Sequence, residues 1–176
     1  MTRESKDIIE FTILYNKHKV KLFNYVLKMV GDLMQAQDMV QNIFLKLYQN
    51  LESIRNMNSI HFWLFKTARN EIYTYYRSKK VRVDQFNVLD SGELEIESLY
   101  DLELEYEKKE LKEVILAELE KLPVAQKDIF LLKEYGGFSY KEIASILKIE
   151  KNLVKSRLFK VRQKLIKRIG FKITSD

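Results

Sequence analysis

Aromatic rings, cations and one amide alternate along residues 59–80, a stretch that has the spacing of a helix. At about 100° per residue, the apolar side chains gather on one side: Leu64, Ala68, Ile72 and Tyr75. The opposite side carries Phe62, Lys66, Asn70, Tyr73 and Arg77, with Trp63 and Arg69 at its edges. Such a face suits single-stranded nucleic acid, because bases stack on rings, the backbone meets cations and an amide can read a base edge. Packing of these rings against a neighbouring helix is the alternative interpretation.

A second candidate is the basic stretch 151–168, which holds eight Lys and Arg and no acid. Its apolar residues fall on one helical stripe: Val154, Leu158, Val161 and Leu165. The other face carries Asn152, Ser156, Phe159 and Gln163, flanked by Lys155, Arg157, Lys160 and Arg162. That face can enter a groove of duplex DNA while the flanking cations reach phosphates. A merely solvated basic helix is the alternative, but solvated helices normally mix both signs of charge.

The residues before this basic stretch complete a helix-turn-helix. Residues 139–147 predict a short helix with Ser139 as N-cap and Glu142 at the capping-box position. In the turn that follows, Lys148 stands where such motifs often use glycine to reach a positive φ. Ala144 is small at the point where the two helices must approach closely.

The chain lacks the residue sets that common enzymes need. It has no cysteine, and its two histidines, His18 and His61, fall in different predicted helices. The chain therefore offers few ligands for a zinc ion. The five glycines never approach the spacing of a phosphate-binding loop. Carboxylate pairs occur mainly in one acidic stretch, where solvated acids make poor general acids. We therefore expect no catalytic residue, no metal and no cofactor.

Helices are also predicted for the N-terminal part of the chain. Apolar residues recur at helical steps between residues 8 and 30: Ile8, Phe11, Tyr15, Leu22, Val26 and Met29. Gly31 would end this helix, and Asp32 with Gln35 predicts the capped start of a second one. The second helix would bury Ala36, Val40, Ile43, Phe44 and Leu47. Ser59 is expected to be the N-cap of the third helix.

Two further helices are predicted before the helix-turn-helix. Residues 111–122 have helical periodicity, and Pro123 stands at the first position of a helix that Gly136 and Gly137 would end. No segment alternates apolar and polar residues for long enough to predict a sheet. We expect an all-α protein.

Charge divides the chain into three parts. Residues 1–83 hold 14 Lys and Arg against 7 Asp and Glu, residues 84–107 hold none against 9, and residues 108–176 hold 17 against 9. The first part of the acidic stretch, which contains the break Ser91-Gly92, predicts an extended linker, and a helix at its end is left open. We expect two small helical domains, 1–83 and 108–176, joined by this linker, 84–107. Basic domains suit a polyanionic partner, with solubility alone as an equal alternative.

The overall composition fits this division. The chain has 176 residues, of which 46% are hydrophobic, enough to build packed cores. No window approaches the roughly 20 apolar residues of a membrane span, and the first ten residues mix charges with apolar side chains, unlike a signal peptide. We expect no membrane insertion. The lack of cysteine fits a reducing compartment and favours a cytoplasmic location.

Taken in order, three stretches resemble ECF (extracytoplasmic-function) sigma factors of bacterial RNA polymerase. The helix of sigma domain two that docks on core polymerase is similar to residues 38–51, DMVQNIFLKLYQNL. The promoter-melting and minus-ten-reading helix of that domain is similar to residues 62–80, FWLFKTARNEIYTYYRSKK. Sigma domain four, which binds the minus-thirty-five element, is similar to residues 122–165. A helix-turn-helix alone is a common motif, whereas this ordered set is specific.

The resemblance implies a transcription initiation factor that catalyses no bond chemistry itself. It implies as partners core RNA polymerase, promoter DNA and an anti-sigma protein that covers the polymerase-binding surfaces. The DNA would be double-stranded upstream and single-stranded at the minus-ten element. Asp38, Gln41 and Asn42 would lie in the polymerase-docking face, and Asn70 would line the pocket for a flipped-out minus-ten base.

The residues singled out above on the third helix and on the basic helix would then contact the two promoter elements. The minus-ten set is Phe62, Trp63, Lys66, Arg69, Asn70, Tyr73 and Arg77. The minus-thirty-five set is Asn152, Lys155, Ser156, Arg157, Phe159, Lys160 and Arg162.

Two other functions remain open. An ordinary DNA-binding regulator would use only the helix-turn-helix and an N-terminal oligomerisation bundle, and would leave the Trp63–Arg77 face unexplained. A nucleic-acid-processing enzyme would need a carboxylate or histidine cluster in a basic cleft, which the sequence does not offer.

Overall fold

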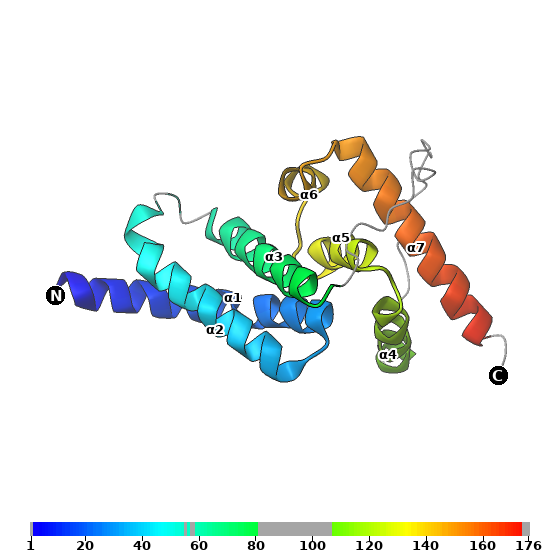
Figure 1. Cartoon of the computed structure of the whole chain (residues 1–176), viewed down its shortest axis with the longest axis horizontal. Helices are drawn as coiled ribbons and strands as arrows, with labels where there is room; N and C mark the ends of the chain where they lie inside the picture. The colour runs from blue at the N-terminus through cyan, green and yellow to red at the C-terminus, as the bar shows by residue number, and fades with distance from the viewer. Residues whose placement is uncertain (1, 55, 57–58, 81–106, 174–176) are drawn as a thin grey trace. The chain divides into compact units, whose positions relative to one another are not determined.

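The computed structural model describes residues 2–54, 56, 59–80 and 107–173. Within these ranges the chain is helical and contains no strand, which confirms the expected all-α class. It forms two compact units, one built on α1 to α3 and one built on α4 to α7 (Figure 1). The predicted acidic linker, 84–107, lies outside the described residues except for Glu107, which begins α4.

The N-terminal unit begins with α1 (Arg3–Val30) and α2 (Leu33–Asn50), which meet at the predicted glycine. Gly31 has a φ of 72°, a left-handed conformation that glycine adopts at little steric cost, and its N–H donates to Leu27 O. Asp32 then caps α2 as expected, accepting from Gln35 N at 2.9 Å. The first helix starts earlier than predicted, because Thr2 caps it by accepting from Ser5 N.

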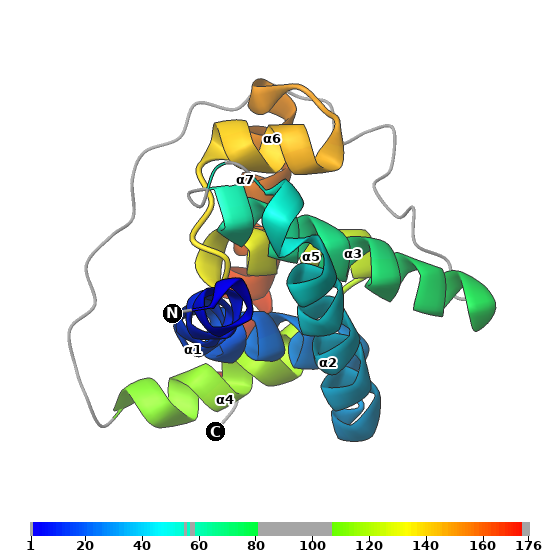
Figure 2. The ribbon, with the colours of Figure 1, turned by 90° about the vertical axis from the view of Figure 1, so that its left-hand side faces the viewer.

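A short 3₁₀ helix (Leu51–Ser53) and α3 (Ile60–Ser78) complete this unit. The three long helices pack around a shared core. Figure 2 shows how they cross, seen along α1. Fully buried residues from all three helices fill that core: Leu22, Tyr25, Val26, Met29, Ile43, Leu47, Leu64, Phe65, Ala68 and Ile72. The helix that carries the candidate strand-reading face is therefore fixed against both others.

The prediction that Ser59 caps α3 with its side chain is wrong. Ser59 precedes the helix, but its side chain makes no capping hydrogen bond, and its φ of −86° and ψ of −7° are already helical. A capping side chain needs an extended backbone to reach the N–H groups of the first turn. Instead, the Ser59 hydroxyl donates to Asn56 O at 2.6 Å.

The C-terminal unit contains α4 (Glu107–Glu120), α5 (Val124–Glu134), α6 (Tyr140–Leu147) and α7 (Lys151–Ile173). Pro123 stands just before α5, and its carbonyl accepts from Gln126 N and Lys127 N. Both halves of the predicted capping box at α6 form, since Glu142 N donates to Ser139 Oγ and Ser139 N donates to Glu142 Oε2.

Lys148 has the left-handed conformation expected at the turn, with φ 55° and ψ 46°. The stripe of α7 packs inward as predicted, because Val154, Leu158, Val161 and Leu165 are 4% exposed or less. Among the described residues, no helix combines the length and apolar content needed to cross a membrane.

Candidate nucleic-acid interfaces

The first candidate interface lies on the side of α3 that faces away from the core. Leu64, Ala68 and Ile72 are fully buried, as predicted. On the opposite side Lys66, Asn70 and Arg77 are exposed, and four further residues are half-buried: Phe62, Trp63, Arg69 and Tyr73. None of the seven predicted minus-ten residues is buried in the core.

The core of α3 differs from the prediction in one pair of residues. Tyr75, which is predicted to lie with the apolar cluster, is only half-buried, and Lys79 Nζ lies 4.8 Å from the centroid of its ring. Phe65, which was given no role, is fully buried and tilted against Tyr25, with ring centroids 5.1 Å apart. The buried face of α3 is thus rotated toward Phe65, because α3 packs on two helices at once.

Rings and cations are paired along the outer face. The guanidinium carbon of Arg69 lies 4.1 Å from the centroid of the Tyr73 ring, and Lys66 Nζ lies 6.0 Å from that of Phe62. Arg77 Nε donates to Tyr73 O at 3.3 Å. Cation–π contacts at these distances hold flat side chains and positive charge together at the surface. This combination suits stacking against bases beside a phosphate backbone.

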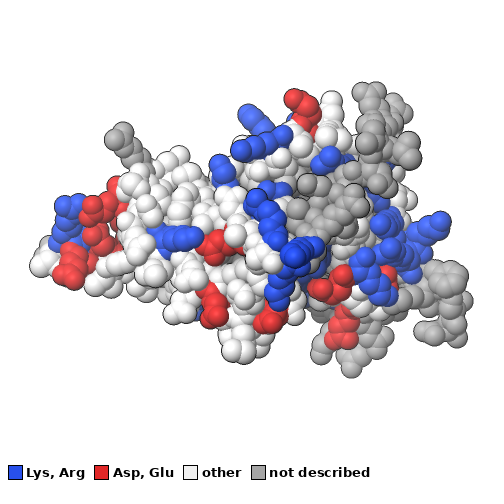
Figure 3. Space-filling view, in the orientation of Figure 1, with Lys and Arg blue, Asp and Glu red and all other residues white. Residues whose placement is uncertain are grey.

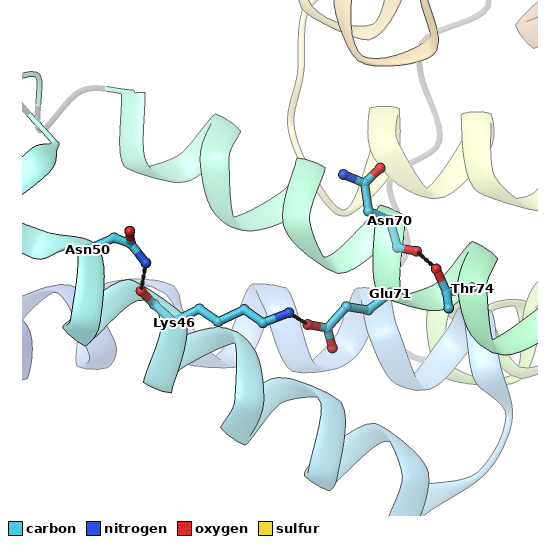
Figure 4. A network of polar contacts seen from close by, with 5 residues as sticks. All are labelled: Lys46, Asn50, Asn70, Glu71 and Thr74. Atoms are coloured by element: carbon cyan, nitrogen blue, oxygen red, sulfur yellow. Dashed lines mark hydrogen bonds and ion pairs between the residues drawn. The ribbon is translucent and has the colours of Figure 1, made fainter.

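Asn70 is exposed on the outer face of α3. Its backbone carbonyl accepts from Thr74 Oγ1 at 2.9 Å, a bond within the helix that does not involve the side-chain amide. Figure 4 shows this amide on one side of α3, while the neighbouring Glu71 reaches toward α2 on another. The geometry allows the amide to contact a base edge that is brought to this face.

The second candidate interface is the helix-turn-helix. Asn152 at the start of α7 is exposed, and the other six predicted minus-thirty-five residues are half-buried: Lys155, Ser156, Arg157, Phe159, Lys160 and Arg162. Lys155 Nζ lies 5.8 Å from the centroid of the Tyr140 ring, and Lys133 Nζ lies 4.9 Å from it. Tyr140, which sequence reasoning did not single out, thus links the first helix of the motif to the recognition helix.

Positive charge continues past the motif. In Figure 3, Lys and Arg side chains crowd the C-terminal half of α7, where Arg162, Lys164, Lys167 and Arg168 follow one another. Arg168 Nη1 also lies 4.0 Å from the buried carboxylate of Glu118, which pairs with Lys121 Nζ at 2.8 Å. A net positive helix attracts phosphates without reading sequence.

The predicted docking residues lie on the outer side of α2. Asp38, Gln41 and Asn42 are all exposed. Gln41 also lines an open groove of about 660 Å³ between α1 and α2. The other lining residues are mostly apolar or aromatic: Ile8, Phe11, Tyr15, Phe23, Gln37, Val40, Phe44, Leu45 and Tyr48.

This α1–α2 groove was missed by sequence reasoning. Ile8 and Tyr15 were assigned to a helical stripe with buried residues, but they are 50% and 39% exposed. The Tyr15 ring packs on Phe44 with centroids 4.7 Å apart, and Phe11 packs on Tyr48 at 5.2 Å. Leu45 and Tyr48 are 54% and 42% exposed. Periodicity identified the apolar residues but could not distinguish a core from an open groove.

The two histidines, predicted in separate helices, are neighbours. His18 on α1 is buried, and its ring stacks on that of His61 on α3. In the part of the chain that the structure describes, no group of three or more His, Cys, Asp or Glu could hold a metal ion.

Comparison with known proteins supports the ordered pair of regions. Residues 14–82 match the family model for sigma-70 region 2, and residues 112–165 match the model for sigma-70 region 4. RNA polymerase sigma factor YlaC of Bacillus subtilis is 30% identical over 155 residues, 88% of each chain. The ECF RNA polymerase sigma-E factor of Escherichia coli K12 is 29% identical over 164 residues, 87% of this chain and 83% of the relative.

Two solved structures have a similar fold. The sigma factor RpoE of Bartonella quintana, solved with the anti-sigma factor NepR, has a TM-score of 0.67 and 25% identity, covering 90% of this chain and 95% of its own. CnrH, solved with the cytosolic domain of CnrY, has a TM-score of 0.61 and 21% identity, covering 91% and 87%, and supports the fold alone. With both sigma-70 regions present in order and its relatives matched over most of their length, the chain belongs to the RNA polymerase sigma factors of the ECF type.

Proposed function

We propose that this chain binds core RNA polymerase and directs it to promoters by reading a minus-ten and a minus-thirty-five element. Residues 1–83 would act as sigma domain two, residues 84–107 as a linker and residues 108–176 as sigma domain four. The observation that carries the proposal is the outer face of α3, where the exposed amide of Asn70 stands among rings and cations. An ordinary duplex-binding regulator has no use for such a face.

On α3, the rings would stack on bases of the opened strand and the cations would hold its phosphates. Asn70 would read one base that has left the duplex, since its amide offers both a donor and an acceptor. Phe62, Trp63, Lys66, Arg69, Tyr73 and Arg77 would surround that base and its neighbours. The pairing of Arg69 with Tyr73 supports this role, because it holds a ring and a charge at the surface together.

On α7, different residues would position the helix and read the sequence. Asn152, Ser156 and Phe159 would face base edges or thymine methyl groups in the major groove. The flanking Lys155, Arg157, Lys160 and Arg162 would contact phosphates, which fix the register but carry no sequence information. The buried stripe on the other side of α7 supports this orientation.

Core polymerase would dock on the outer side of α2 through Asp38, Gln41 and Asn42. The neighbouring α1–α2 groove would accept apolar side chains from the docked partner, because Gln41 belongs to both surfaces. The relative RpoE was solved with the anti-sigma factor NepR, and CnrH with a domain of CnrY. We propose that this chain is likewise held inactive by an anti-sigma protein that covers the docking surface.

Transcription from purified components tests the proposed function. The chain is added to sigma-free core polymerase and a panel of promoter fragments, and transcripts are mapped. Transcripts with defined 5′ ends that depend on the added chain support it. Upstream duplex binding without transcripts would identify an ordinary regulator instead, and chemical change of the nucleic acid would identify an enzyme.

A further inference from the structure

One ion pair joins the helix that carries the docking residues to the helix that carries Asn70. Lys46 Nζ on α2 donates to Glu71 Oε1 on α3, and the two side chains are 50% and 20% exposed (Figure 4). The amide of Asn50 donates to Lys46 O at 2.8 Å, one turn farther along α2. Lys46 itself lies one turn beyond Asn42 on the same flank of α2.

Glu71 lies on α3 between the exposed Asn70 and the buried Ile72. It follows Asn70 directly, so the two side chains leave the helix about 100° apart. Ile72 comes next and is fully buried, whereas Asn70 is exposed and Glu71 is intermediate. The direction in which Asn70 leaves the helix is therefore linked to how the next two residues are held: Glu71 by Lys46, and Ile72 by the core.

The ion pair adds a polar restraint to this apolar packing, because a charge-assisted hydrogen bond holds the Glu71 carboxylate against α2. A second polar contact restrains the far end of α3, where the hydroxyl of Tyr76 donates to Met29 O at the end of α1. Thus α3 is restrained on α2 beside Asn70 and on α1 one and a half turns later.

We propose that Lys46 and Glu71 are positioning residues, which hold α3 in the rotation that presents Asn70 to an unpaired base. Because Lys46 stands on the proposed docking helix, polymerase bound to α2 would stabilise the strand-reading side of α3 through this pair. The proposal rests on the proposed function. Half-exposed ion pairs contribute little free energy, so we expect a loss of roughly two- to five-fold in promoter opening when the pair is broken.

A double-mutant cycle in the full holoenzyme tests the pair. Lys46→Gln, Glu71→Gln and the double variant are compared by the rate of promoter opening, together with core affinity and thermal unfolding. Each single change should slow opening about two- to five-fold, and the double variant should be no slower than the worse single one. Core affinity and the unfolding temperature should stay close to those of the parent.

The decisive comparison repeats Glu71→Gln in a chain that already carries Asn70→Ala. If Glu71 acts by positioning Asn70, its neutralisation should have no further effect there. The matched control is the ion pair of Arg3 with Glu52, 2.7 Å long in the same unit, whose side chains are 77% and 63% exposed. Arg3→Gln with Glu52→Gln should leave opening unchanged.

Three results would overturn the proposal. In the first, Glu71→Gln opens promoters as fast as the parent or faster; in the second, Glu71→Gln slows opening just as much in the chain that carries Asn70→Ala. In the third, the effects of Lys46→Gln and Glu71→Gln on the rate of opening simply add in the double variant. In the third case a loss of core affinity in Lys46→Gln alone would show that Lys46 contacts polymerase directly. These results differ from failure of the proposed function, in which the parent chain itself would open no promoter.

Discussion

The rings of His18 and His61, on α1 and α3, stack with their centroids 5.5 Å apart. Burial, together with the neighbouring His61 ring, lowers the pKa of His18 to about 4. The folded chain therefore holds His18 neutral where the unfolded chain would protonate it, below a pKa of 6.5. The contribution of His18 to the free energy of unfolding is fully present above pH 6.5 and is lost as the pH falls toward 4.

We expect the free energy of unfolding to fall by at most about 3 kcal/mol between pH 7 and pH 4 because of His18. Urea unfolding of the parent and of His18→Gln across this range measures the effect. The variant should be less stable at pH 7 but should lose less stability on acidification. Parallel curves for the two proteins would show that other groups cause the acid sensitivity.

The turn of the helix-turn-helix offers a stabilising change. Lys148 is non-glycine at φ 55°, a conformation that costs an L-residue roughly 1–2 kcal/mol. Lys148→Gly should relieve that cost while adding up to about 1 kcal/mol of chain entropy to the unfolded state. Thermal unfolding should show equal or greater stability, by up to about 1 kcal/mol. Lys141→Gly, in the first turn of α6, is the control and should lose stability, by up to about 1 kcal/mol.

Local features of this fold could be predicted from the sequence. Asp32 with Gln35, and Ser139 with Glu142, lie three residues apart, so their capping contacts depend only on the chain between them. The stripe of α7 was also predicted, because a helix with one apolar side has one way to pack. The left-handed backbone conformation at Lys148 could also be predicted, because the turn of a helix-turn-helix often needs a positive φ at this position.

Contacts between helices could not be predicted. The core position of Phe65, the stacking of His18 on His61 and the ion pair of Lys46 with Glu71 each join residues far apart in sequence. Their geometry depends on the angles at which helices cross, and periodicity along one helix carries no record of those angles. The exposure of Tyr15 in the α1–α2 groove has the same origin.

The α1–α2 groove can be tested through Leu45, which lines it and is 54% exposed. Leu45→Glu should weaken binding to core polymerase about five- to thirty-fold, on the order of 1–2 kcal/mol, because a carboxylate then enters an apolar contact. Folding should change little, since the side chain is already half in water. Val20→Glu is the matched control, because Val20 is 61% exposed on α1 and does not line the groove. Equal affinities for both variants and the parent would exclude the groove from docking.

Lys155 and Phe159 on α7 should have different roles: Lys155 should contribute affinity for any duplex, and Phe159 should contribute sequence preference. Lys155→Ala should weaken binding to all upstream elements alike and reduce the salt dependence by about one phosphate contact. Phe159→Ala should change which sequences are preferred, because an apolar contact with a base is lost. Binding to a panel of duplexes at several salt concentrations measures both. Uniform effects of both changes across the panel would contradict this division.

Asn70 should contribute to strand opening and not to folding. Its side chain is exposed opposite Leu64 and Ile72, so Asn70→Ala should change the free energy of unfolding by no more than about 0.5 kcal/mol. Loss of a base contact should cost on the order of 1–3 kcal/mol in promoter opening. The rate of opening on an intact promoter, affinity for a promoter with a pre-melted minus-ten region, and thermal stability are measured together.

Asn16→Ala is the matched control for Asn70, because Asn16 is an exposed amide within α1 of the same unit. It should open promoters as fast as the parent. Duplex binding through the helix-turn-helix should survive in both variants, since α7 is untouched. If Asn70→Ala unfolds the N-terminal unit, the amide has a structural role; if it opens promoters as fast as Asn16→Ala does, the outer face of α3 does not read the opened strand through this residue.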